Sequence, residues 1–142
     1  MAKRPEIDTP VETTWPAVVW AARLSVYLLA QGALVLLAYA YFGFGSDPES
    51  FAPGFRTDPL LAAANLAWGA AGTYIGFFRP SYALPFVLGC ATFYAALAAL
   101  GSFTPYHLGM RLDGQVALFH WCIALPALAV GLCALWRKSE HP

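Results

Sequence analysis

The chain has 142 residues, of which 59% are hydrophobic and only 11% charged, and its mean hydropathy is +0.57. Because a soluble domain carries roughly a quarter charged residues, this composition excludes an ordinary water-soluble domain and predicts an all-α integral membrane protein with about four spans of about 20 residues each. Eight basic residues balance eight acidic ones, so no net charge attracts nucleic acid, and a nucleic-acid partner is not expected.

The chain begins with a polar arm, residues 1–15, whose mixed charges are unlike the cationic start of a secretory signal. The first apolar run, about residues 16–44, predicts a helix of about 28 residues, or roughly 42 Å. This exceeds the roughly 30 Å hydrocarbon core of a bilayer. We therefore expect Trp15, Trp20 and Arg23 to lie among the headgroups at its start.

Three further apolar runs predict the remaining spans, at about residues 59–78, 81–103 and 115–136. Asp58 and Pro59 are typical of the N-cap and the first turn of a helix. A short polar tail, residues 137–142, closes the chain. Residues 16–136 are therefore predicted to form a four-helix transmembrane bundle.

The basic residues are distributed unevenly between the two sides of this bundle. The side of the termini would hold Lys3, Arg4, Arg23, Arg79, Arg137 and Lys138. The opposite side would hold Arg56 and Arg111, together with Asp47, Glu49, Asp58 and Asp113. The positive-inside rule therefore predicts that both termini are cytoplasmic.

Small residues recur at helical spacing on two spans. They are Gly69, Gly72 and Gly76 in the second span, and Gly89 and Ala96 in the third. In lipid, small residues let helix backbones approach closely. We interpret them as helix-packing positions, either within the bundle or against another subunit, and a substrate groove is the alternative.

Polar side chains of three spans are predicted at one depth. By the helical rise, His120 lies about 9 Å below the outer surface, and Asn65 and Tyr94 reach nearly the same level. Gln31 in the first span needs a partner, in the bundle or on a neighbouring subunit. One interpretation is a hydrogen-bond cluster that fixes helix register. The other is a cofactor site, with His120 as ligand or donor and Asn65 and Tyr94 as orienting groups, for a quinone, a (bacterio)chlorophyll or a haem.

No hydrolase, P-loop, zinc-protease or dinucleotide-binding motif occurs in the sequence. Enzymatic activity is therefore disfavoured, and no catalytic residue or metal ligand is assigned. The cysteines, Cys90, Cys122 and Cys133, lie in apolar runs without metal-site spacing and are expected to be buried free thiols.

Four short spans, an acidic loop after the first, and a fourth span entered through Asp113 with His120 on the same helix face resemble DoxX-like proteins and related uncharacterised bacterial four-span families. The resemblance covers about residues 17–136. It implies the bacterial inner membrane and, for some members, an association with quinone-linked redox complexes.

The lack of a catalytic motif, the small-residue helix faces and the small soluble mass together favour a non-catalytic accessory or structural subunit of a larger membrane complex, respiratory or photosynthetic. Its expected partners are the lipid bilayer and other integral membrane subunits. The alternatives are a redox or pigment protein that binds a quinone or tetrapyrrole through His120, and a small transporter.

Overall fold

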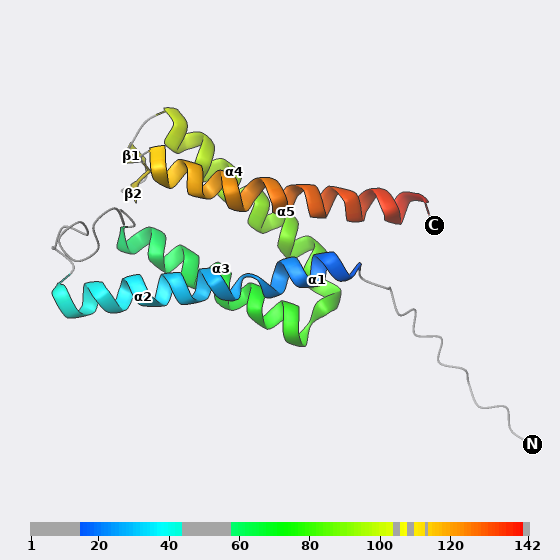
Figure 1. Cartoon of the computed structure of the whole chain (residues 1–142), viewed down its shortest axis with the longest axis horizontal. Coiled ribbons are helices and arrows are strands. Elements are labelled where there is room, and N and C mark those ends of the chain that lie inside the picture. The colour runs from blue at the N-terminus through cyan, green and yellow to red at the C-terminus, as the bar shows by residue number, and fades with distance from the viewer. Residues whose placement is uncertain (1–14, 44–57, 104–105, 108–109, 113, 141–142) are drawn as a thin grey trace, which may run out of the picture.

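The computed structural model describes residues 15–43, 58–103, 106–107, 110–112 and 114–140, and the statements below concern these residues (Figure 1). The polar arm and the loop predicted after the first span lie outside them. The elements in chain order are helices α1 (Pro16–Arg23), α2 (Val26–Phe42) and α3 (Pro59–Phe78), a 3-10 turn η2 (Pro80–Tyr82), helix α4 (Ala83–Phe103), strands β1 (Tyr106–His107) and β2 (Met110–Arg111), and helix α5 (Gly114–Glu140).

Helices dominate the described chain, which confirms the predicted all-α class. Four segments are long and apolar enough to cross a membrane: 16–42, 59–78, 80–103 and 114–140. The start of α1 and the end of α5 lie at the same end of the molecule (Figure 1). An even number of spans produces this arrangement.

The first predicted helix, residues 16–44, is not one regular helix. It is interrupted at Leu24 and Ser25, where the Ser25 amide donates to the carbonyl of Ala22 and the Tyr27 amide to that of Leu24. These bonds reach back three residues instead of four, as in a 3-10 turn. The first span is therefore built from two helices, α1 and α2, joined by a tightened turn.

Two helix ends follow directly from local chemistry. Helix α2 ends at Phe42 because Gly43 has a φ of 98°, a conformation that glycine adopts without steric cost. Helix α3 begins at Pro59, and the side chain of Asp58 accepts a hydrogen bond of 2.8 Å from the Leu61 amide. The N-cap predicted from Asp58 and Pro59 is therefore confirmed.

The last helix is longer than predicted, because residues 137–140 of the expected tail are helical and α5 continues to Glu140. Cationic residues such as Arg137 suit the negative end of the helix dipole. The Arg137 guanidinium also lies over the ring of Trp15 at the start of α1, 4.8 Å from the ring centroid. Helix α5 runs through Pro126 without interruption.

Between the third and fourth predicted spans the structure has two short strands. Strands β1 and β2 pair antiparallel, with Tyr106 opposite Arg111 and His107 opposite Met110. Each strand has only two residues. This short pairing between α4 and α5 leaves the helical class unchanged.

The long helices pack mainly as two pairs, α2 along α3 and α4 along α5. Helix α1 links the pairs because it contacts α3, α4 and α5, and α3 meets α4 over a shorter stretch. Figure 1 shows α2 and α5 on opposite sides of the molecule. The largest fully buried side chains are Tyr39, Tyr94, Leu61, Leu112, His120, Val18, Val87 and Asn65.

Glycines at the contact of α2 and α3 let the two backbones touch. A Cβ atom at Gly69 would overlap the backbone of Leu29. In the reverse direction, a Cβ at Gly32 would lie 2.5 Å from the amide nitrogen of Leu66. Neither position accepts a larger residue unless the helices move apart, which is the behaviour expected of small residues in membrane helix pairs. Gly69 was predicted as a packing position from its spacing, whereas Gly32 was not.

Further along α3, two more glycines face the first span. Gly72 lies against the side chains of Ser25 and Phe86, and Gly76 against Arg23. These contacts fall at the tightened turn between α1 and α2. The predicted small-residue face of α3 is therefore a close contact with the first span.

Gly89 and Ala96 are placed differently, because both are exposed on α4. A Cβ at Gly89 would lie 3.7 Å from the Trp68 ring, which is ordinary contact. Helix α4 instead buries the face that carries Val87, Cys90, Ala91, Tyr94 and Ala98. Gly89 and Ala96 are therefore not close backbone contacts within the described chain, as Gly69 is, since residue spacing defines a face but not the neighbour that meets it. Docking against another subunit stays a prediction.

Candidate functional site

A chain of hydrogen bonds crosses the interior of the molecule. The Asn65 Nδ2 group on α3 donates to Gln31 Oε1 on α2 over 2.6 Å, and the Tyr94 hydroxyl on α4 donates to Asn65 Oδ1, also over 2.6 Å. Asn65 and Tyr94 are fully buried. The partner that Gln31 needs is therefore supplied within the chain, and one amide joins three spans.

His120 adds the fourth span to this polar layer, which we define as Gln31, Asn65, Tyr94 and His120. Its ring centroid lies 5.4 Å from that of Tyr94 and 5.9 Å from that of Phe119. The side chain is 0% exposed, and within the described chain neither Nδ1 nor Nε2 has a hydrogen-bond partner. The structure thus brings the three predicted residues together, but it joins His120 by ring contact alone.

The depth of the layer follows from where two helices begin. Asn65 lies less than two turns after Pro59, and His120 less than two turns after Gly114. Because α3 and α5 start at the same end of the molecule (Figure 1), equal helical rise brings both residues to one level. Sequence reasoning could find the level, but not the partner of each side chain.

The hydrogen-bonded part of the layer stabilises the fold, whereas the buried His120 ring destabilises it. The Gln31, Asn65 and Tyr94 groups satisfy one another, whereas a buried imidazole without partners costs about 1–3 kcal/mol. Such an orphaned group can mark a bound ligand. Here, however, protein completely encloses the ring and both of its nitrogens. Neither a tetrapyrrole macrocycle nor a quinone ring has room beside His120 in this arrangement, so these groups do not fit the geometry.

Replacing His120 with leucine is expected to leave stability unchanged or raise the free energy of unfolding by about 1–2 kcal/mol, because two unpartnered polar atoms are removed from the interior. His120→Ala is the matched control, since the cavity it leaves should cost about 2 kcal/mol. Both are measured by unfolding in detergent. A leucine variant that is clearly less stable than the unsubstituted protein would contradict a closed layer and indicate a group bound to the ring.

Other reactive side chains do not gather into a site. No group of three or more His, Cys, Asp or Glu residues with metal-binding geometry occurs in the part of the chain that the structure describes. Cys90 is buried as expected, but Cys122 and Cys133 are exposed because they lie on the outward side of α5. The expectation of three buried thiols is therefore wrong for two of them.

One polar contact was missed in the sequence. The Nε group of Arg23 on α1 donates to the carbonyl oxygen of Gly76 on α3 over 2.9 Å. The sequence does show an arginine in one predicted span and glycines in the next span. That signal could not be used without knowing which faces of the two helices meet.

Comparison of the chain with models of protein families, with curated proteins and with solved structures finds no match. The resemblance to DoxX-like proteins therefore stays a prediction.

Proposed function

We propose that this chain is a non-catalytic accessory or structural subunit of a larger complex in the bacterial inner membrane, with both termini in the cytoplasm. The complex would be of the respiratory or photosynthetic kind, as suggested by the resemblance to families associated with quinone-linked redox assemblies. The surface of α4 is the observation that carries the proposal.

The exposed face of α4 presents small side chains, namely Gly89, Thr92 and Ala96. A surface that meets only lipid needs no small residues, whereas a second helix can approach closely at such positions. The segment that contains α4 is the most buried of the four, yet only 44% of its apolar 18-residue stretch is buried within the chain. More than half of every span is thus left for lipid or another protein, and the α4 face has the residue types suited to a helix of another subunit.

The polar layer supports a structural role for the same reason. Hydrogen bonds between Gln31, Asn65 and Tyr94 fix the register of three spans. A protein whose task is to present a rigid helical face needs such a device. A transporter would instead need several intramembrane charges or paired broken helices around a central site. Arg23 and the interruption at Leu24 and Ser25 fall short of such a set in the described helices.

The test places larger side chains on the exposed face of α4. Gly89→Leu and Ala96→Leu are expected to reduce the amount of partner subunits that copurify in mild detergent by about tenfold, since overpacking costs about 1–3 kcal/mol. Ala30→Leu is the matched control, because Ala30 is also exposed, on α2, but lies between the bulky, exposed Tyr27 and Leu34.

All three variants should keep the unfolding temperature of the isolated chain, since the three positions are exposed and a Cβ at Gly89 would meet the Trp68 ring at an ordinary contact distance of 3.7 Å. Equal copurification in the α4 variants and in the control would contradict docking through this face.

A further inference from the structure

Arg23 is held between α1 and α3 by three groups. Its Nε donates to the Gly76 carbonyl oxygen over 2.9 Å, and its Cζ lies 5.2 Å from the centroid of the Trp20 ring and 5.0 Å from that of the Phe77 ring. A Cβ at Gly76 would lie 2.8 Å from both Cγ and the backbone nitrogen of Arg23. Glycine is therefore needed for this approach. The orientation of the guanidinium is fixed by backbone and aromatic contacts.

The charge of Arg23 has no counter-ion within the described chain. No acidic side chain there pairs with it, and its two terminal nitrogens, Nη1 and Nη2, donate to no described residue. The two aromatic side chains that flank the guanidinium are exposed at the surface, Trp20 by 60% and Phe77 by 55%. A guanidinium is a planar fork that binds two oxygens of one phosphate at once. The arginine therefore presents an unused phosphate-binding edge at the surface of the helices.

The position along the span matches the edge of a bilayer. Gly76 lies in the last turn of the 20-residue helix α3, about 26 Å from the start of that helix by the helical rise. The hydrocarbon core of a bilayer is about 30 Å thick. A guanidinium tied to Gly76 is thus at the depth where lipid phosphates begin, and tryptophan is enriched at this level.

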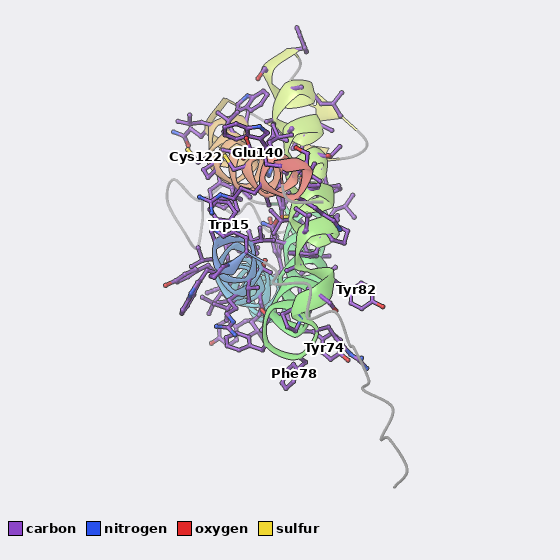
Figure 2. The ribbon with its side chains drawn as sticks, turned by 90° about the vertical axis from the view of Figure 1, so that its right-hand side faces the viewer. Trp15, Tyr74, Phe78, Tyr82, Cys122 and Glu140 are labelled. Atoms are coloured by element: carbon purple, nitrogen blue, oxygen red, sulfur yellow. The ribbon has the colours of Figure 1, made fainter. Side chains whose placement is uncertain are left out.

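The same end of the molecule carries two more arginines held by aromatic side chains. Arg79 directly follows α3 beside Tyr74, which raises the pKa of the Arg79 guanidinium, and Arg137 lies over the Trp15 ring. Figure 2 views this end, with Trp15 and Tyr74 among the labelled side chains. Glu140 is the only acidic residue at this end among those described. The local charge is therefore positive and complementary to an anionic lipid surface.

We propose that Arg23 binds the phosphate of an anionic phospholipid in the leaflet that faces the chain termini. Nη1 and Nη2 would donate to phosphate oxygens while Nε stays on Gly76, and the Trp20 and Phe77 rings would pack beside the glycerol and the upper acyl chain. This site does not depend on the proposed subunit role, because it needs only a bilayer.

The test counts lipids on the purified full chain. The protein is reconstituted in phosphatidylcholine nanodiscs that contain a minor fraction of phosphatidylglycerol, and native mass spectrometry measures the phosphatidylglycerol retained after release. Arg23→Gln is expected to lower this retention about fivefold, the effect of losing about 1 kcal/mol per cation at an anionic surface. Unfolding in pure phosphatidylcholine checks that the variant is folded.

Two matched variants make the result specific. Arg111→Gln removes a cation from β2 near the opposite ends of the spans and should leave retention unchanged. Arg23→Lys keeps the charge but loses the planar fork, so it should restore only part of the retention. Equal loss in Arg23→Gln and Arg111→Gln, or full retention in Arg23→Lys, would overturn the site. Competition by millimolar inorganic phosphate would assign the same edge to free phosphate instead and would also overturn the lipid proposal.

Discussion

Replacing Gly69 with alanine is expected to lower the free energy of unfolding by about 3 kcal/mol, at the upper end of the usual cost of overpacking. The added Cβ would overlap the backbone of Leu29, and backbone atoms cannot rotate away as a side chain can. Helices α2 and α3 would have to separate along their main contact. The measurement is unfolding of the purified protein in detergent, followed by helical circular dichroism or by gel mobility.

Gly89→Ala is the matched control for this substitution. It makes the same chemical change on α4, where the new Cβ would meet only the Trp68 ring at 3.7 Å. Alanine is also the better helix former, by about 0.5–1 kcal/mol. The control should therefore be neutral or slightly stabilising. Equal effects at Gly69 and Gly89 would contradict the close contact of α2 and α3.

The second large effect is expected at the centre of the polar layer. Asn65→Leu removes two hydrogen bonds of the layer at once, the bond to Gln31 and the bond from Tyr94. Interhelical hydrogen bonds in membranes contribute about 0.6 to 2 kcal/mol each, so the free energy of unfolding should fall by about 2 kcal/mol. The loss of helix register should also broaden the unfolding transition.

Tyr94→Phe separates the two bonds of Asn65, because it removes only the hydroxyl that donates to Asn65 Oδ1. We expect a loss of about 1 kcal/mol. In the double variant Asn65→Leu, Tyr94→Phe, the losses should not add, since both substitutions break the same bond. Additive losses would show that the two side chains are not coupled and that the layer does not act as a unit.

The four spans could be predicted because hydrophobicity is a property of each local run of residues. Each apolar run is long enough for a helix that could cross a membrane, and the structure has four such helices. The Asp58 cap marked the start of α3. The interruption at Leu24 and Ser25 could not be predicted, because neither residue breaks helices by itself. It occurs where the first span packs on Gly72 and Gly76, which is a tertiary contact.

The candidate site was predicted in level but not in connectivity. Helical rise fixes depth, so Asn65, Tyr94 and His120 could be placed in one layer from the sequence. Hydrogen bonds also depend on the rotation of each helix about its axis, which apolar runs in lipid leave undefined. For that reason the Gln31 to Asn65 bond and the isolation of His120 emerge only from the structure.

The same limit explains the two small-residue faces. Gly69 and Gly89 each belong to a line of small residues at helical spacing, yet one faces α2 and the other faces outward. Spacing indicates that a face is suited to close approach, and the structure decides whether the neighbour lies within the chain. The outward face of α4 is therefore the feature on which the subunit proposal depends.

The most direct test of that proposal is the mass of the native particle that contains the unsubstituted chain. The protein would be purified through a C-terminal tag in mild detergent and analysed by native mass spectrometry. We expect a particle in which other integral membrane subunits accompany the chain in a fixed ratio, and which Gly89→Leu disrupts. A stable, homogeneous particle that contains this chain alone would contradict the proposal.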